Sequence, residues 1–336
     1  MDFTPSDDQR MVAESFGRVF TDEGDHWAAL EEAGLARATW PEALDGAGMG
    51  LADMLPALVE AGRAATAAPV IGCGVMPGLA LSRAGRAAPH VPDGRLCLAF
   101  QSARKDAGNA ISGTLGPVPG GDLADQALVC MHGDRLAIVA LRDRDAYELV
   151  DGSSAADLRL DAASPPAVGD TVPGLTDWLH DAAATAYCAT ALGAMLAARD
   201  MTLDYLGQRK QFGRPLSAFQ VLQHRMVDLH HDTEHFLSLV HLAAHACDGS
   251  DPDLRARAVS ALKIHLGGRI RDAAASAVQL HGGIGMTEDY ALGRLVKRVL
   301  VADMLTGRTD MHRARLAGLI AQETRARSAK PEESAA

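Results

Sequence analysis

The sequence predicts an α+β protein made of three consecutive regions: an N-terminal helical domain (1–90), a small central antiparallel β domain (91–168) and a C-terminal helical domain (169–325). In the first and third regions apolar residues recur at steps of three and four, as on one face of a helix. The middle region instead has short apolar runs separated by turn residues. A chain of 336 residues is long enough to form two or three domains around a sizeable core.

Four helices are expected in the N-terminal region, over 7–19, 25–33, 51–63 and 77–84. The glycine-rich stretch Gly46–Gly50 superficially suggests a dinucleotide-binding loop. No β-rich strand precedes it and its spacing differs from that motif, so we interpret it as a turn into the helix that begins at Leu51.

The middle region is expected to be β structure. Its clearest apolar runs are Leu96–Phe100 and Ala127–Met131. Turn residues cluster at His132–Asp134 and Asp151–Ser153. Short apolar runs between such turns are typical of a small antiparallel β domain.

Long helices are expected from Asp177 onward. A capping aspartate followed by proline at Asp251–Pro252 predicts the start of another helix. The tail 326–336, rich in Lys, Glu, Ser, Ala and Pro, is expected to be disordered. One helix of about seven turns is predicted by a single apolar face, formed by Leu222, Met226, Leu229, Phe236, Val240 and Ala243.

Composition favours a cytoplasmic enzyme subunit. The chain is 48% hydrophobic but only 4% aromatic, which suits packed helices, and its net charge of −11 argues against a nucleic-acid groove. The five cysteines are scattered with no CxxC pair, as expected for reduced core residues. No export-type N-terminal stretch and no apolar run of about 20 residues is evident.

Two motifs carry the strongest functional signal. Gln279–Gly285 contains two adjacent glycines in an Ala-rich helical pattern, where each glycine costs about 1 kcal/mol relative to alanine. Such glycines indicate that a ligand or another backbone approaches closely. Gln208–Gly213 supplies an arginine fork that suits a phosphate, together with an amide and an aromatic ring that suit a base.

In this order and spacing the two motifs resemble the acyl-CoA dehydrogenase family. The resemblance is nearly gap-free over 182–319, includes Asp8–Arg10 and Pro41–Leu51 near the N-terminus, and holds only in outline over 91–168. It implies the acyl-CoA dehydrogenase fold, with a four-helix-bundle-like C-terminal domain, and FAD as cofactor.

The resemblance also implies which residues contact FAD, across a subunit boundary. Arg209 would pair with the pyrophosphate, Phe212 and Gln220 would meet the adenosine end, and glycines would close over the phosphates or the adenine. The full implied set of cofactor-binding residues is Arg209, Gln211, Phe212, Gln220, Gln279, Gly282 and Gly283.

The resemblance makes the absence of a catalytic base conspicuous. Family members use a glutamate to remove the α-proton of an acyl-CoA thioester while FAD takes a hydride from the β-carbon. Thr306 stands at the common position of that glutamate, and Ala183 stands at the position used by a minority of the family. Asp181 is the nearest acid and is the candidate for a substitute base. A threonine hydroxyl is far too weak a base for this proton.

The middle region also departs from the family pattern. Members grip the flavin ring with a Thr-Glu-Pro-Gly type loop and a Trp-Ile-Thr type strand. Here the corresponding stretch is Phe100–Arg104, and no tryptophan lies between Trp40 and Trp178.

The sequence therefore predicts a subunit of a heteromeric FAD-dependent acyl-CoA dehydrogenase that is inactive alone. It resembles the degenerate subunit of heterotetrameric, steroid-type enzymes, and its partner would be a second family member that carries the catalytic glutamate. The alternative is a structural or regulatory relative without a cofactor role. A metal held by the pairs His231/His235 or His241/His245 is a further alternative to an interface role for these histidines.

Overall fold

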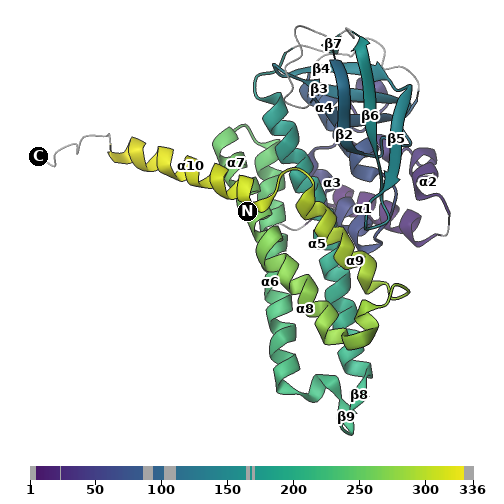
Figure 1. The fold of residues 1–336 in the computed structure, drawn as a ribbon, viewed down its shortest axis with the longest axis vertical. Coiled ribbons are helices and arrows are strands. Elements are labelled where there is room, and N and C mark those ends of the chain that lie inside the picture. The colour runs from purple at the N-terminus through teal and green to yellow at the C-terminus, as the bar shows by residue number, and fades with distance from the viewer. Residues whose placement is uncertain are drawn as a thin grey trace, which may run out of the picture.

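The computed structural model describes residues 5–22, 24–85, 94–101, 111–163, 167–168 and 171–328. Long helices lie side by side, and a β domain and the N-terminal helices pack at one end of them (Figure 1). The predicted α+β class is confirmed. The predicted domain limits fall at or beside residues outside the described ranges, and they stay predictions.

The N-terminal helices follow the sequence pattern closely. The helix predicted over 51–63 is found with these bounds, and its start after Gly50 confirms the turn predicted there. Ser6 caps the first helix through a reciprocal contact with Gln9, and Asp25 caps the second. The elements are α1 (Asp7–Thr21), α2 (His26–Glu32), η1 (Leu35–Arg37), η2 (Glu42–Leu44), α3 (Leu51–Arg63), η3 (Val70–Val75) and α4 (Met76–Arg83).

The β domain contains two sheets. One has the order β1 (Leu96–Phe100), β3 (Gln126–Met131), β4 (Arg135–Ala140), β7 (Ala167–Val168). The other has the order β2 (Ile111–Pro119), β6 (Ser154–Ala163), β5 (Asp143–Glu148). All neighbours pair antiparallel except β1 and β3, which are parallel. The parallel pair departs from the purely antiparallel expectation because the chain passes through β2, in the other sheet, before it returns beside β1.

The C-terminal region is built around α5 (Leu175–Gln208), which packs against α3, α6, α7, α8 and α9. This helix is long and apolar enough to cross a membrane, but 89% of its apolar window is buried inside the protein, as in a core helix. The other elements are β8 (Lys210–Gln211), β9 (Arg214–Pro215), η4 (Leu216–Ala218), α6 (Gln220–Asp248), α7 (Pro252–His265), η5 (Leu266–Ile270), α8 (Arg271–His281), η6 (Gly282–Met286), α9 (Leu292–Met304) and α10 (Thr309–Ser328).

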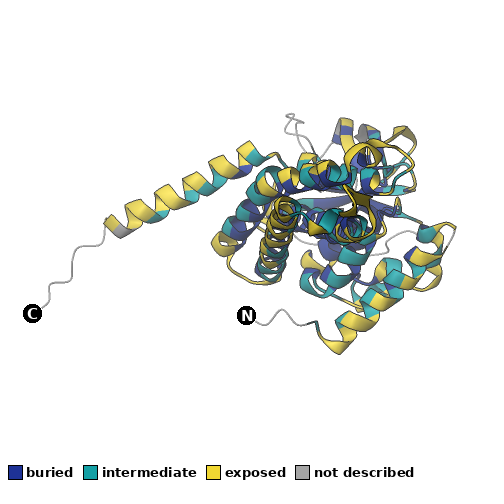
Figure 2. Ribbon diagram, turned by 90° about the horizontal axis from the view of Figure 1, so that it is seen from below, coloured by how far each residue is buried: buried dark blue, intermediate teal, exposed yellow. Residues whose placement is uncertain are grey.

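Two of these helices match specific predictions. The helix predicted from the apolar face that starts at Leu222 is α6, and Asp251 caps α7 with Pro252 at its first position. Helix α10 projects away from the bundle and is mostly exposed toward its end (Figure 2). It includes the first three residues of the segment expected to be disordered. Residues 329–336 of that segment lie outside the described residues.

The crossing of α3 and α5 depends on two glycines. A Cβ atom at Gly193 would lie 1.9 Å from the carbonyl oxygen of Val59, and one at Gly62 would lie 2.0 Å from that of Thr190. Both distances are far below van der Waals contact, so each backbone occupies the space that a side chain would need. The position of α5 in the molecule is therefore fixed by close backbone approach.

We expect Gly193→Ala to destabilise the protein by about 1–3 kcal/mol or more, because the added methyl group forces the two helices apart. The matched control is Gly207→Ala in the same helix, where a Cβ meets nothing within 4 Å. That change should stabilise the fold by up to about 1 kcal/mol, since alanine is the better helix former. Urea unfolding of both variants measures the difference, and equal effects would contradict the close-approach account.

Candidate functional site

The Gln208–Gly213 motif forms the end of α5 and a two-residue β-hairpin turn. Strands β8 and β9 pair on either side of Phe212 and Gly213, which both have positive φ angles, 54° and 79°. Positive φ at both central residues is the requirement of a type I′ hairpin, and it is uncommon for phenylalanine. The Phe212 side chain is 88% exposed. An aromatic ring held outward on a strained backbone indicates a binding function.

The adjacent glycines lie just beyond α8 rather than inside it. Helix α8 ends at His281, and Gly282 leaves the helical conformation with a φ of 64°. A Cβ atom at Gly283 would meet nothing within 4 Å. The two glycines therefore begin the short 3-10 helix η6 and are not interior residues of an α-helix. The space beside Gly283 is open in this chain, so any close approach there comes from another molecule.

Tertiary contacts bring the two motifs together. Tyr205, one turn before Arg209 on α5, stacks on His281 with ring centroids 4.7 Å apart. Gln220 begins α6 directly after the hairpin segment. All of the predicted cofactor-contacting residues are exposed and lie at the end of the helical bundle opposite the β domain (Figure 1).

The polar groups of this surface are available for a ligand. Within the described part of the chain, no hydrogen bond or ion pair is made by the side chains of the four predicted polar residues, Arg209, Gln211, Gln220 and Gln279. An unpaired arginine fork, free amides and an exposed ring fit the phosphates and the base of a dinucleotide such as FAD. The sequence analysis missed Arg214, whose guanidinium lies 4.1 Å from the centre of the Phe219 ring. Its place opposite Gln211 in the hairpin was the available signal.

A second site lies at the other end of α5. A cavity of about 200 Å³ is bounded by α5, the β domain, η3 and the segment after α9. Ala183 and Thr306 both line it, so the two positions at which the family places its base face one cavity. Its described lining residues include no carboxylate, and the Thr306 hydroxyl donates to the carbonyl of Leu305 at 2.6 Å.

The turn that carries Thr306 is firmly held. Lys263 on α7 is fully buried, and its Nζ donates to the carbonyls of Ala302, Asp303 and Leu305 at 2.8, 3.1 and 2.9 Å. Burial lowers the pKa of Lys263. The backbone at the base position is therefore well ordered, although it carries no base.

Asp181 does not act as a substitute base in this arrangement. It is buried and is not part of the cavity wall. Its carboxylate accepts hydrogen bonds from Arg255 at 2.8 Å and from Arg315 at 2.9 Å. Two guanidinium groups bind the carboxylate between α7 and α10, so it has a structural role.

The two sites are far apart on the same chain. About seven turns of α5 separate Ala183 from Arg209, or roughly 40 Å at 5.4 Å per turn. No side chain spans such a distance. The cavity itself is smaller than the roughly 300 Å³ at the lower end of ordinary ligand pockets.

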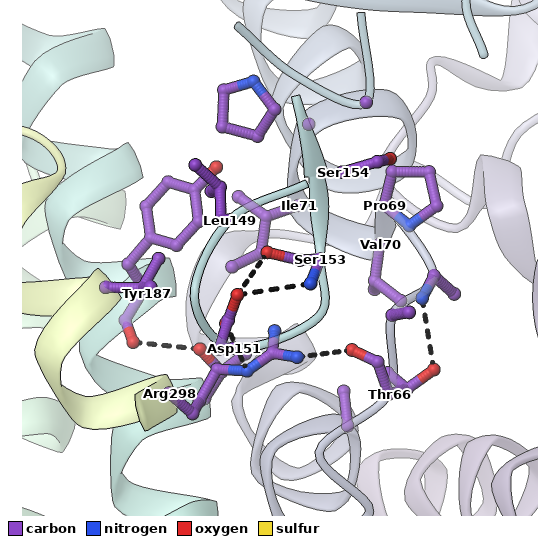
Figure 3. A pocket seen from close by; sticks show the side chains of 18 of the residues that line it. Thr66, Pro69, Val70, Ile71, Leu149, Asp151, Ser153, Ser154, Tyr187 and Arg298 are labelled. Carbon is purple, nitrogen blue, oxygen red and sulfur yellow. Dashed lines mark hydrogen bonds and ion pairs between the residues drawn. The ribbon is translucent and has the colours of Figure 1, made fainter. Parts of the chain in front are cut away.

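A buried ion pair joins the three regions beside this cavity (Figure 3). Arg298 on α9 lies 2.9 Å from the carboxylate of Asp151 in the β domain and donates to the carbonyl of Thr66 at 2.5 Å. Asp151 also accepts from the backbone and the hydroxyl of Ser153. The carboxylate is fully buried, and burial lowers the pKa of Arg298.

The histidine-rich face of α6 does not form a metal centre in the described part of the chain. No group of three or more His, Cys, Asp or Glu side chains is placed there to hold a metal ion. His235 instead lies near the ring of His265, with centroids 6.4 Å apart. The stretch Phe100–Arg104 stands where the family grips the flavin, and the sequence predicts that this grip is lost. The stretch is described only as far as Gln101, so that expectation stays a prediction.

A bundle of long helices with a β domain at one end is an architecture found in flavoenzymes. Similarity to known proteins identifies the family. Residues 180–320 match the model of the acyl-CoA dehydrogenase C-terminal domain. The acyl-CoA dehydrogenase IpdE2 of Mycobacterium tuberculosis is 30% identical over 276 residues, which cover 81% of this chain and 79% of that protein. This chain belongs to the acyl-CoA dehydrogenase family.

Further relatives match over almost the whole length. The acyl-CoA dehydrogenase FadE28 of Mycobacterium tuberculosis is 28% identical and covers 95% of this chain and 98% of its own length. The solved structure of a Tcur3481-Tcur3483 steroid ACAD variant is 25% identical, with a TM-score of 0.80 and coverage of 94% and 98%. The ChsE4-ChsE5 complex from Mycobacterium tuberculosis shares the fold, with 20% identity, a TM-score of 0.76 and coverage of 98% and 100%.

We expect Arg298→Met to destabilise the protein by about 3–5 kcal/mol, because it leaves the Asp151 carboxylate buried without a counter-charge. The control is Arg159→Met, which removes two ion pairs between exposed side chains, those of Arg159 on β6 with Asp143 and Asp145 on β5. Exposed pairs contribute about 0–1 kcal/mol. Urea unfolding measures the free energy of unfolding of both variants. A small effect of Arg298→Met would show that the buried Arg298–Asp151 ion pair does not hold the three regions together.

Proposed function

We propose that this chain is one subunit of a heteromeric FAD-dependent acyl-CoA dehydrogenase that desaturates an acyl-CoA thioester. It contributes contacts to the FAD of a neighbouring subunit, and an unlike partner supplies the catalytic glutamate. When bound, FAD would accept the hydride that leaves the β-carbon of the substrate.

The distance between the two sites carries this proposal. Arg209, Phe212 and Gly283 form an exposed surface without internal partners, about 40 Å along α5 from this chain's own cavity. Residues arranged in this way cannot serve a cofactor seated in that cavity. They suit a cofactor held by an adjoining subunit, on which the arginine fork would bind phosphate and the ring would pack against the base.

The composition of the cavity supports the second half of the proposal. Removal of the α-proton needs a general base, and neither Thr306 nor Ala183 can provide one. Asp181 is occupied by two arginines. A catalytic glutamate would therefore come from the partner.

An apolar groove supports assembly. A groove of about 480 Å³ runs between the end of α5 and the start of α6, beside the hairpin. Its apolar residues are Leu203, Leu206, Leu222, Met226 and Val227. Exposed apolar surface of this kind marks an interface. We propose a heterotetramer, two copies of this chain with two of the partner, because the relatives include structures of two unlike components.

The substrate class and the compartment follow from weaker observations. One structural relative is a steroid ACAD, which supports a role in steroid degradation. All five cysteines are buried and unpaired, which supports the cytoplasm as the compartment.

The chain purified alone should show no acyl-CoA dehydrogenase activity, whereas its co-purified complex with the unlike subunit should be yellow and active. Thr306→Glu should not restore activity to the isolated chain, because its sequence also lacks the loop and the strand with which the family grips the flavin ring. Absorbance at the flavin bands measures the bound flavin, and turnover with an acyl-CoA measures the activity, for the isolated chain and for the complex. Robust turnover by the unaltered chain alone, or a colourless complex, would overturn the proposal in favour of a structural or regulatory role.

Arg209→Ala should lower the affinity of the complex for FAD by roughly ten- to a hundredfold. The change removes a charge-assisted contact of about 1.5–3 kcal/mol, and melting temperature should hardly move because the side chain is exposed. Arg209→Lys should recover only part of the loss, since an ammonium group lacks the fork. Bound FAD is measured after dilution of the complex.

The matched control for this experiment is Arg142→Ala, an equally exposed arginine beside the β domain. It should leave FAD occupancy unchanged. If Arg209→Ala behaves like Arg142→Ala, or lowers melting temperature without loss of FAD, the hairpin is a helix-end structure and not a cofactor contact.

A further inference from the structure

His281 is a buried residue in the middle of an exposed surface. It is the last residue of α8 and directly precedes Gly282. Gly282 and Gly283, which are predicted to contact FAD, are exposed, whereas His281 is only 2% exposed. The segment that presents the predicted contacts to solvent therefore sends this one side chain into the protein.

Aromatic rings from two other segments pack on the His281 imidazole. Tyr205 of α5 is stacked on it, with ring centroids 4.7 Å apart and an angle of 26° between the ring planes. Tyr290, between η6 and α9, contacts it with centroids 5.3 Å apart and an angle of 57°. Ring pairs at these separations attract each other beyond the effect of the area that they bury. One imidazole thus joins α5, α8 and the segment that leads into α9.

The Tyr205 side of this stack leads to the arginine motif. The backbone N–H of Arg209 donates to the carbonyl of Tyr205 at 2.9 Å, which closes the last turn of α5. The contact between Tyr205 and His281 therefore ties the turn from which Arg209 emerges to the end of α8.

The glycine turn also packs on His281. A Cβ atom at Gly285 would lie 3.0 Å from the Cβ of His281 and 2.8 Å from the carbonyl oxygen of Val278. Both distances are shorter than van der Waals contact, so a side chain at Gly285 would push η6 away from α8. The glycines of the motif thus differ in role: Gly285 packs on the protein itself, whereas the space beside Gly283 is open.

The hydrogen bonding of His281 separates it from a ring that only fills space. Nδ1 lies 2.9 Å from the carbonyl oxygen of Ala277, and because a carbonyl only accepts, Nδ1 carries the hydrogen. Nε2 is then an acceptor, and it is buried without a partner among the residues that the structure describes. A buried acceptor without a donor lowers stability, and phenylalanine would fill the same space without it. Stability alone therefore does not favour histidine here, whereas the Nδ1 hydrogen bond fixes the ring against the last turn of α8.

We propose that His281 is a positioning residue for the predicted FAD-contacting surface. Its hydrogen bond and its two ring contacts hold Gly282 and Gly283 in a fixed place relative to Arg209, so that both motifs meet one ligand together. His281 does not touch the cofactor, since it is buried under the turn. A surface that is ordered before binding loses less conformational entropy when the ligand arrives, and it binds more tightly for that reason. This inference rests on the cofactor role proposed for the surface.

The first measurement uses the full chain without a partner. His281→Phe keeps a ring but removes the Nδ1 hydrogen bond. Amide hydrogen exchange in 282–290, followed by mass spectrometry, should become about two- to tenfold faster, the value of one hydrogen bond. Melting temperature should hardly change, because the unpartnered acceptor is removed as well. The control is Val240→Ala in the core of α6, which should lower melting temperature and leave exchange in 282–290 unchanged.

The second measurement is the affinity for FAD of the complex with the unlike subunit. His281→Phe should weaken FAD binding about two- to tenfold, because the turn is no longer fixed before binding. Val240→Ala should leave FAD binding unchanged, although it lowers stability. Arg209→Ala serves as the reference, since it removes a proposed direct contact.

Unchanged hydrogen exchange in His281→Phe would overturn the inference, as would an equal loss of FAD affinity in Val240→Ala. If Arg209→Ala weakens FAD binding and His281→Phe does not, only the positioning role of His281 fails. If neither variant changes FAD binding, the proposed function itself fails, and the inference with it. Should His281→Phe not fold, Tyr205→Leu removes the same stack from the side of α5 and has the same expected results.

Discussion

The close approach of α3 and α5 through Gly62 and Gly193 governs the rest of the structure. It seats a continuous helix of 34 residues in the centre of the molecule, in contact with the N-terminal and C-terminal helices alike. Because this helix is long, it sets the distance between the cavity at one end and the hairpin at the other. A chain built in this way keeps the cavity and the hairpin apart, at opposite ends of one helix.

The sequence predicted well what depends on local pattern. Period and capping located α3, α6 and α7, because an apolar face and a capping residue such as Asp251 act within a few residues of each other. The family resemblance singled out Thr306 and Ala183 as the two base positions, and both residues line the same cavity. The residues predicted to contact FAD are exposed, and their binding role stays a prediction.

What the sequence did not predict depends on contacts between distant segments. The parallel pairing of β1 with β3 follows from the path of the chain through the other sheet, which no short window reveals. Arg298 forms an ion pair with Asp151 and a hydrogen bond with Thr66, and each partner is more than a hundred positions away in the sequence. On sequence alone Asp181 was the candidate for a substitute base. In the structure its carboxylate is bound by Arg255 and Arg315, which are distant in the sequence.

The outward ring of Phe212 has a consequence for how this chain is made, if it is the subunit proposed above. On its own, the chain carries a strained, fully displayed aromatic residue beside an apolar groove. Surfaces of that kind are what chaperones and proteases recognise in incompletely assembled proteins. A copy of the chain without its proposed partner would therefore be degraded quickly. The chain would accumulate only when the partner subunit that covers the hairpin is synthesised at the same time.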